Sequence, residues 1–278
     1  MKIIALAALA ALTAATPAFA QSADVTSWTG PYAGVRAGYS IQPSDGDERI
    51  TFDTDRGGGF NDTVRTAAGA DAFSPGFCGG SARGTTPAAG CRKDDDSLDL
   101  GIQAGFDYDL GSVVVGAVAE AGYGFATDSV TAFSTTPAYY TMTRQMQENA
   151  GVRGRVGYAF GARRNTLVYG TGGVVWAKMK NTIRSSNTGN AYRVFGDDKV
   201  FGYRYGGGIE QRVAQHLSLG LQYLRTSLGD SGGRVDVSRG TQPATNPFIL
   251  VNPNGTIFRR SHTRFVTHNI SATANFRF

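Results

Sequence analysis

Three residues of the types used in nucleophilic catalysis lie close together in the last quarter of the sequence. His216 and Ser218 flank Leu217, and an acid, Asp230, follows Ser218 by twelve residues. A base, a nucleophile and an acid act together only when the three side chains are within hydrogen-bond contact. Twelve residues of extended chain span about 40 Å, at roughly 3.3 Å per residue. We therefore predict no catalytic residues, and that the protein is not an enzyme.

The first twenty residues have the features of a secretory signal peptide. Lys2 supplies a positive tip, residues 3–15 an apolar core, and Ala18-Phe19-Ala20 a small-x-small cleavage site. A transmembrane anchor is the alternative, but this run is shorter than the about 20 apolar residues that a spanning helix needs. We predict export, with residues 1–20 as signal peptide, residues 21–29 as a periplasmic lead and residues 30–278 as a single domain.

Cys78 and Cys91 are the two cysteines, and they lie 13 positions apart in a segment rich in Gly, Ala and Thr. In an exported protein an even pair indicates a disulfide, which stabilises the closed loop by about 3 kcal/mol in the chain-entropy model. Two free thiols and half of a metal site are the alternatives. Because no histidine lies near the pair, we predict neither a metal site nor a cofactor.

Charged side chains recur at the polar positions of segments that otherwise alternate with apolar residues. Because each unpaired ion removed from water costs several kcal/mol, we expect these charges to pair. Glu120 is expected to pair with Arg153 or Arg155 on the neighbouring segment, and Arg204 and Glu210 to join the same network. The charges expected on this polar face are Arg36, Asp99, Asp107, Glu120, Arg153, Arg155, Lys178, Arg204 and Glu210.

These charges need strands to position them, and the end of the sequence shows the strand pattern most clearly. From Ile270 to Phe278 every second residue is apolar, and the residues between are polar. Side chains of a strand alternate between its two faces, so this segment has one apolar and one polar face. With its apolar face toward lipid, such a strand is stable only if the sheet closes on itself around a polar lumen.

Seven further segments alternate in the same way, and the connections between them predict the architecture. The predicted strands are 30–41, 98–108, 113–125, 150–160, 165–180, 201–210, 217–224 and 268–278. Their connections run alternately long or medium and short: 43–96, 109–111, 127–146, 161–164, 181–198, 213–216 and 229–262. Outer-membrane barrels have short periplasmic turns and longer outside loops. We predict an all-β fold, an eight-stranded antiparallel up-and-down transmembrane β-barrel with long extracellular loops.

Two further expectations concern the facing of one predicted strand and the structure of the first long connection. Within residues 165–180, Leu167, Tyr169, Val175 and Met179 share one face, and Lys178 is expected on the other, lumen-facing side. Residues 43–96 hold so few apolar side chains that we expect a loop without a core of its own. A soluble sandwich or lipocalin-like barrel is disfavoured because the polar faces are crowded with glycine, which suits a narrow eight-stranded lumen.

Composition excludes two other classes of protein. No long apolar run follows residue 20, which excludes a helical membrane protein. Without residues 1–20 the chain carries 26 basic and 22 acidic residues, a net charge of +4, and it has no Lys/Arg tract. Nothing in this balance favours binding to nucleic acid.

Several of these segments resemble the strands of a known family. The first-strand sequence Trp28-Thr29-Gly30-Pro31-Tyr32-Ala33-Gly34 resembles the signature of the small outer-membrane β-barrel family of Gram-negative bacteria, porin-like or opacity-like proteins with an OmpA-type barrel. Later segments similar to its strands are 101–108, 152–160, 169–173, 206–210 and 275–278. The resemblance does not extend to segments 43–96 and 229–262.

The resemblance implies an integral protein of the outer membrane, in contact with lipid and lipopolysaccharide. It also implies folding by the barrel-assembly machinery, which recognises a C-terminal aromatic strand, here with Phe276 and Phe278. It does not imply an enzyme. Members of the family are described as surface antigens, structural proteins, adhesins or haem binders.

We expect a structural and surface-interaction role, with the lumen plugged by its polar and charged network. The alternative is a small porin-like diffusion channel in which the same charges line an ion pathway. Eight strands favour the plug because they enclose a narrow interior. Four residues of the last long loop could meet an unknown extracellular ligand, or its arginines could touch lipopolysaccharide phosphates: Phe248, Phe258, Arg259 and Arg260.

Overall fold

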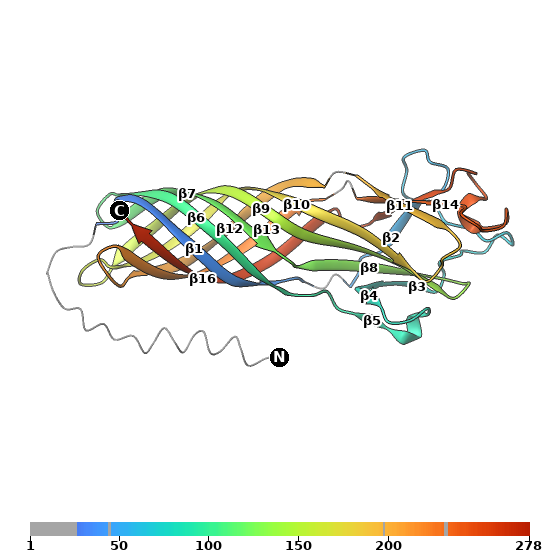
Figure 1. The fold of residues 1–278 in the computed structure, drawn as a ribbon, viewed down its shortest axis with the longest axis horizontal. Coiled ribbons are helices and arrows are strands. Elements are labelled where there is room, and N and C mark those ends of the chain that lie inside the picture. The colour runs from blue at the N-terminus through green and yellow to red at the C-terminus, as the bar shows by residue number, and fades with distance from the viewer. Residues whose placement is uncertain (1–26, 44–45, 197, 231–232) are drawn as a thin grey trace.

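The computed structural model describes residues 27–43, 46–196, 198–230 and 233–278. Eight long antiparallel strands form a closed barrel in chain order, and the last of them pairs with the first (Figure 1). They are β1 (Gly30–Ile41), β6 (Ser97–Asp109), β7 (Val113–Gly124), β9 (Ala138–Phe160), β10 (Thr166–Ser185), β12 (Lys199–Arg212), β13 (Leu217–Gly229) and β16 (Arg264–Arg277). The predicted fold class is confirmed.

Short turns join the strands at one end of the barrel, the end at which the C-terminus also lies (Figure 1). The turns are residues 110–112, 161–165 and 213–216. Gly111 and Gly161 have φ of 95° and 93°, a backbone conformation that residues with a Cβ rarely adopt. Outer-membrane barrels keep their short turns in the periplasm, so for the barrel predicted from the sequence this is the periplasmic end and the opposite end is the outer end.

The side chains alternate between the lumen and the outside as their polarity predicts. In β1, Val35 and Tyr39 are exposed on the outer face, whereas Arg36 between them is buried in the lumen. The register is continuous on both sides of this strand, with Arg36 opposite Gly101 of β6 and Thr273 of β16. Glycine and small polar residues therefore leave room in the lumen for a few long charged side chains.

The facing predicted for β10 is wrong. Leu167, Tyr169, Val175 and Met179 do share a face, but they are buried inside the barrel, and Lys178 lies on the opposite face. The reason is that the interior is apolar near both ends of this strand. Leu167 and Tyr169 pack with Trp28 at the periplasmic end, and Val175 and Met179 belong to an apolar cluster nearer the outside. A prediction from polarity alone therefore assigned the wrong face of β10 to the lumen.

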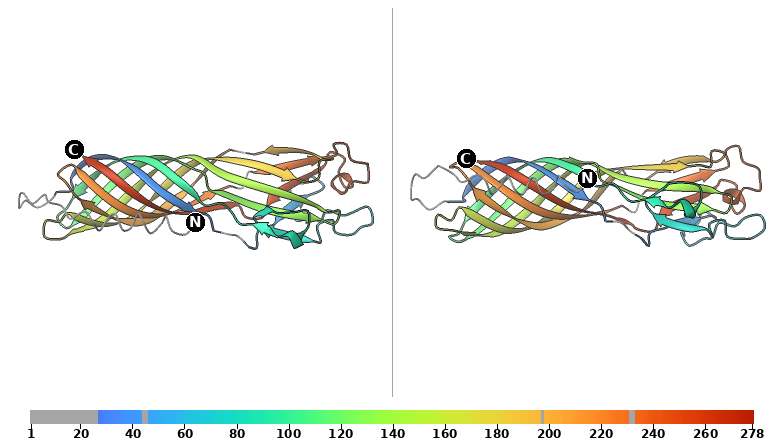
Figure 2. Two further views of the ribbon diagram at one scale, coloured as in Figure 1. Left: turned by 60° about the horizontal axis from the view of Figure 1, so that its bottom comes forward. Right: turned by 90° about the horizontal axis from the view of Figure 1, so that it is seen from below.

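Beyond the outer end of the barrel the chain builds a second folded layer, which we call the cap (residues 46–96, 127–146, 180–196 and 233–263; Figures 1 and 2). Extensions of β9 and β10 continue into the cap, and β8 (Thr127–Ser134) and β3 (Gly76–Gly79) pair onto the edge of β9. A separate antiparallel sheet has the order β11 (Ala191–Phe195), β14 (Arg234–Ser238), β15 (Thr256–Arg260) and β2 (Ile50–Asp53).

The expectation that residues 43–96 form a loop is wrong for the described part of this segment, which contains strands such as β2 and β3. Ile50, Phe52, Val64 and Phe73 from this segment are buried in the core of the cap. They are too few to form a core alone, but segments from four connections pool their apolar side chains. The shared core also contains Val130, Tyr140, Met142, Val235, Val237, Phe248 and Phe258.

Aromatic rings hold the centre of this cap core. Phe52 stacks on Phe73 with ring centroids 4.5 Å apart, and Phe258 meets Phe52 edge-on at 5.0 Å. Tyr140 and Phe248 are in edge-to-face contact at 5.5 Å. Aromatic pairs in these geometries add about 0.5–1.5 kcal/mol each beyond the burial of their area, so the cap is a packed unit.

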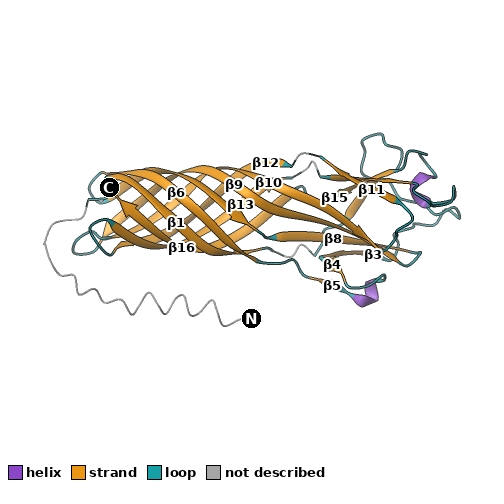
Figure 3. Ribbon diagram, in the orientation of Figure 1, coloured by secondary structure: helices purple, strands orange, loops and turns teal. Residues whose placement is uncertain are grey.

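The two-stranded sheet of β4 (Ser81–Ala82) and β5 (Cys91–Arg92) lies beside the cap, and two short 3-10 helices complete it: η1 (Pro87–Ala89) and η2 (Pro247–Ile249) (Figure 3). Within the described ranges, no helix has the length and apolar character needed to cross a membrane.

Candidate functional site

Two ion-pair networks cross the barrel lumen, and the first lies near its periplasmic end. This periplasmic network joins Asp107, Arg155, Glu210 and Arg277. Arg155 pairs with Asp107 and, at 2.9 Å, with Glu210, while Arg277 lies 2.9 Å from a carboxylate oxygen of each acid. Two cations and two anions thus neutralise one another. Ser218 also donates a hydrogen bond to Glu210 at 2.6 Å.

The second network, which we call the central network, has Glu120 at its centre. Arg153 donates two hydrogen bonds to the two Glu120 oxygens, at 3.1 and 2.9 Å, and Arg204 donates one at 2.7 Å. The remaining donors of Arg204 bond to Thr226 at 2.8 Å and Asn149 at 3.1 Å. The central network therefore ties β7 to β9, β12 and β13 across the lumen.

Further groups link these networks to the other walls of the barrel. Arg36 of β1 forms an ion pair with Asp99 of β6 at 3.2 Å, and both residues are buried. Between the two networks, Gln103 donates to Asn275 at 2.8 Å, and Asn275 donates to Glu210 at 3.2 Å. Side chains from adjacent and non-adjacent strands therefore meet at several levels along the lumen.

Apolar clusters lie at both ends of the charged section of the lumen. Trp28 is fully buried at the periplasmic end, where Nε1 donates to the Arg164 carbonyl at 2.8 Å and the Arg277 guanidinium stacks on the ring at 4.6 Å. At the outer end, a buried cluster fills the barrel above Glu120 and Arg204; its members are Ala126, Met146, Val175, Ala177, Met179, Val200, Leu228 and Phe265.

A third group of charges lies where the barrel meets the cap; we call it the junction cluster (Glu48, Asp94, Asp128, Arg144 and Arg260), and all of its members are buried except the half-buried Asp94. Arg260 pairs with both Glu48 and Asp128, and Arg144 lies 2.7 Å from Asp128. Burial works against it, but Arg260 and Arg144 hold the pKa of Asp128 below its usual value. Burial raises the pKa of Asp94 to about 7, although the Ser129 amide donates to this carboxyl at 2.7 Å.

The junction cluster overturns one expectation about the last long loop. Phe248 and Phe258 are buried in the cap core, and Arg260 is buried in the junction cluster, so these side chains do not face outside. Arg259 lies over the Phe60 ring at 4.0 Å. In the cap, Phe248 and Phe258 pack into the apolar core and Arg260 pairs with two acids. In an open loop these three side chains would have been exposed.

The residues considered for catalysis lie at different levels of the molecule. His216 is in a periplasmic turn, where its Nδ1 is 2.8 Å from the Arg277 carbonyl. Ser218 bonds to Glu210 in the lumen, and Asp230 lies 3.5 Å from Arg144 near the outer end. No nucleophile, base and acid of this set come together.

Of the nine charges expected on the lumen face, the structure places eight inside the barrel and Lys178 on the opposite face of its strand, and it divides the eight between groups. Glu120, Arg153 and Arg204 are in the central network, Asp107, Arg155 and Glu210 in the periplasmic network, and Arg36 with Asp99. The expectation of one network containing both Arg204 and Glu210 is therefore wrong, because the two residues are six positions apart on β12 and lie at different levels of the lumen. Arg277 is a further lumen charge that was not predicted, although its polar position between two phenylalanines indicates a lumen-facing side chain.

Cys78 and Cys91 form a disulfide that joins β3 to β5. Phe276 and Phe278 are exposed on the outer wall at the periplasmic end, with their rings in edge contact at 5.1 Å. Aromatic side chains gather on the outer wall near both ends of the barrel, as in the girdles at the two surfaces of a membrane. The periplasmic group is Phe106, Tyr108, Tyr158, Phe160, Phe276 and Phe278; the outer group is Tyr39, Tyr123, Phe125, Phe201, Tyr203 and Tyr205.

Comparison with known families agrees with this architecture. A family model described as an outer membrane protein beta-barrel domain matches residues 4–278. The chain belongs to this family. As an outer-membrane β-barrel protein, it is located in the outer membrane, and its strands cross the bilayer with the exposed apolar wall toward lipid.

Two curated relatives of this outer-membrane β-barrel protein are both called 31 kDa outer-membrane immunogenic protein, one from Brucella melitensis biotype 1 and one from Brucella suis biovar 1. Each is 28% identical over 208 residues, which covers 74% of this chain and 73% of the relative. Among solved structures, the outer membrane protein OprG from Pseudomonas aeruginosa has a TM-score of 0.51 at 12% identity, covering 93% of this chain and all of that one. That likeness is one of fold alone.

Proposed function

We propose that this outer-membrane β-barrel protein is a non-catalytic structural and surface protein with a plugged lumen. The single observation that carries the proposal is the pair of buried networks, in which side chains from non-adjacent strands meet at Glu120 and at Glu210. Buried ions that pair across a narrow interior resist separation, since breaking one pair leaves an uncompensated charge. The networks therefore fill the lumen and hold the strands in register.

The cap supplies the surface for the second part of the proposal. Its sheet and disulfide present a folded outer face, and the relatives from Brucella carry the word immunogenic in their names. We infer that the cap is the antigenic and interacting part of this chain, and that an extracellular ligand would bind there. The barrel wall would contact lipid and lipopolysaccharide, and Phe276 and Phe278 would be recognised by the barrel-assembly machinery.

Single-channel conductance of the refolded protein in planar bilayers tests the plug. Wild type would be compared with Glu120→Ala, which removes the anchor of the central network, and with Glu148→Ala, whose glutamate is exposed on the outside of β9. We expect wild type and the Glu148 variant to be silent or to show only rare, small openings. An increase in the conductance of the Glu120→Ala variant would then indicate that the charged side chains close the lumen of the wild-type protein.

The opposite result would support the alternative of a small diffusion channel. In that case wild type conducts steadily, and Glu120→Ala changes the size or the ion preference of the current while Glu148→Ala does not. Such an outcome would overturn the plugged lumen without affecting the location of the protein in the outer membrane.

A further inference from the structure

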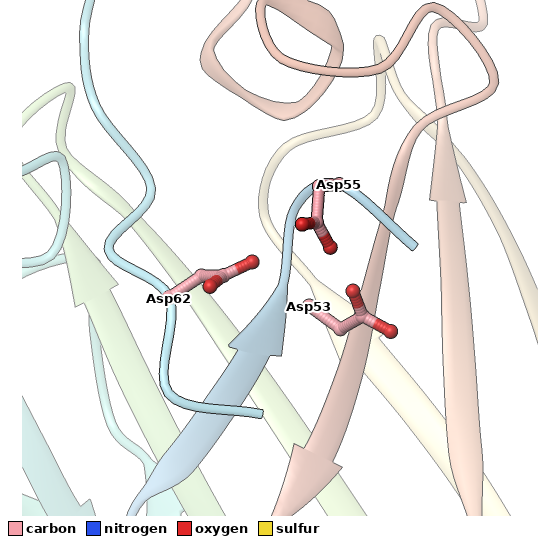
Figure 4. Close-up of side chains that lie close together, drawn as sticks. All are labelled: Asp53, Asp55 and Asp62. Carbon is pink, nitrogen blue, oxygen red and sulfur yellow. The ribbon is translucent and has the colours of Figure 1, made fainter. Parts of the chain in front are cut away.

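Three carboxylates converge on the outer side of the cap, and we propose that they bind a divalent cation of the calcium class. They belong to Asp53, Asp55 and Asp62, each of which offers one oxygen within 4.8 Å of the others (Figure 4). The site lies outside the lumen and is independent of the plug. The sequence analysis predicted no metal site.

The chain builds this group by folding one short segment back on itself. Asp53 is the last residue of β2, and the following turn returns so that the Asp62 amide donates to the Phe52 carbonyl at 3.2 Å. Asp62 then accepts two hydrogen bonds from Thr54, at 2.7 Å from the amide and 2.9 Å from the hydroxyl. These bonds hold the Asp62 carboxylate beside the end of β2.

Asp53 provides a second observation that points to a ligand. Only 1% of this residue is exposed, and one of its carboxylate oxygens, Oδ1, is buried without a hydrogen-bond partner among the described residues. The other oxygen accepts a bond from the Gly58 amide at 3.0 Å. A buried carboxylate oxygen without a donor is costly unless a cation supplies the missing interaction.

The neighbouring arginine does not supply this cation by direct contact, because it bonds to another acid. The nearest arginine along the chain, Arg56, directs its guanidinium to Asp236, with bonds of 2.8 and 3.2 Å. Within the described part of the chain, no lysine or arginine forms an ion pair with Asp53, Asp55 or Asp62. The repulsion among the three like charges is therefore only partly offset, because Arg56 attracts Asp53 electrostatically but forms its ion pair with Asp236.

The donor set selects the class of metal. Carboxylate oxygens suit hard cations, whereas the absence of histidine and cysteine from the set disfavours zinc and copper. Calcium binds oxygens at about 2.3–2.6 Å, so two ligands on opposite sides of the ion are about 4.8 Å apart. The glycines at positions 57–59 allow carbonyls and water to complete its large coordination shell, while magnesium demands a stricter octahedron.

Binding would fasten the segment 54–62 against the cap sheet. Asn252 already donates to the Asp55 carbonyl at 3.0 Å, and Phe60 of the same segment lies under the Arg259 guanidinium at 4.0 Å. A cation at the three aspartates would join these contacts to β2. Calcium is therefore expected to stabilise the outer surface of the cap and to leave the barrel unchanged.

Titration calorimetry of the whole refolded protein with calcium chloride tests the site. The protein is refolded from inclusion bodies in detergent, so that lipopolysaccharide, which itself binds divalent cations, is absent, and it is treated with a chelator beforehand. We expect one calcium per chain in wild type, a loss of affinity of at least tenfold in Asp55→Asn, and no loss in Asp95→Asn, whose aspartate is exposed elsewhere in the cap. Asp55 is itself exposed, so its replacement should not prevent folding.

Tryptic cleavage after Arg56 provides the second readout. Calcium is expected to slow this cleavage in wild type and in Asp95→Asn, to have no effect in Asp55→Asn or Asp53→Asn, and to be more effective than an equal concentration of magnesium. Absence of calcium binding in wild type would overturn the proposal. Binding and protection that survive in Asp55→Asn and Asp53→Asn would overturn it equally, because the ion would then lie elsewhere.

Discussion

Arg204 donates a hydrogen bond to Glu120 at 2.7 Å across the lumen, although β9 and β10 separate their strands in the barrel wall. This contact cannot form within a single hairpin, because it joins the first and fourth strands of the run β7, β9, β10 and β12. Arg153 of β9 occupies the other oxygen of the same carboxylate at 2.9 Å. Glu120 therefore holds side chains from three strands together inside the barrel.

Replacing Glu120 by glutamine should destabilise the barrel by about 3–5 kcal/mol, because it leaves Arg153 and Arg204 buried without their anion. Urea unfolding of the refolded protein in detergent measures the loss. Glu148→Gln is the matched control, since that glutamate is exposed on the outer wall, and it should change stability by less than about 0.5 kcal/mol. Equal effects of the two substitutions would contradict the assigned role of Glu120.

Trp28→Ala should lower stability by about 3–5 kcal/mol, because it empties the apolar layer at the periplasmic end of the lumen. Its ring is fully buried against Leu167 and Tyr169 and lies beneath the Arg277 guanidinium. Trp176, which lies on the outer face of β10, gives the control Trp176→Ala, for which we expect a smaller loss. The same urea titration compares the two variants, and an unchanged midpoint for Trp28→Ala would rule out a sealing role.

The stability of the cap should fall as the pH rises from about 4 to about 7, through the contribution of Asp94. The pKa of this carboxyl is raised from 3.8 to about 7, chiefly by burial; Asp128 and Glu48 contribute to the rise, whereas the Ser129 amide and Arg260 oppose it. The folded state thus binds the proton more tightly than the unfolded state. The resulting stabilisation is complete below pH 3.8 and is lost as the pH rises through 7.

Rates of limited proteolysis of the cap between pH 4 and 8 measure this dependence. Asp94→Asn, which resembles the protonated carboxyl, should flatten the increase in cleavage, and the exposed Asp95→Asn should leave it as in wild type. A pH dependence that is the same in all three proteins would assign the effect to another group.

Removing the disulfide should loosen one edge of the cap and leave the barrel intact. In Cys78→Ser with Cys91→Ser the loop between them loses a constraint worth about 3 kcal/mol, so trypsin should cleave faster after the exposed Arg83. Reducing agent should have the same effect on wild type and none on the double variant. Cleavage at an unchanged rate would mean that the pairing of β3 with β8 holds this edge without the covalent bond.

Phe278→Ala should reduce the amount of protein assembled in the outer membrane several-fold, if the barrel-assembly machinery recognises the aromatic end of β16. Phe201→Ala is a matched control, because both rings are 71% exposed on the outer wall. The heat-modifiability of the protein in membrane fractions reports the folded amount. Equal levels of the two variants would show that the terminal ring is not the recognised feature.

The sequence by itself determined the barrel. A period of two across eight segments, such as Ile270 to Phe278, is a local property, and burying a charge such as Arg36 on the lipid side costs far more than burying it in the lumen. The alternation of long and short connections then specified the up-and-down order of the strands. These features depend on neighbours in the chain, so they are visible without coordinates.

Only the tertiary structure decided what lies at the two ends of the barrel. The inward facing of Leu167 and Met179 depends on Trp28 and Phe265, which come from distant parts of the chain, and the cap core pools rings such as Phe52 and Phe258. The partners in the ion pairs were likewise decided only by the tertiary structure. The sequence indicated that Glu120 and Glu210 face the lumen, but the stagger of tilted strands selected the arginine that each of them meets, because pairing across a lumen depends on three-dimensional register.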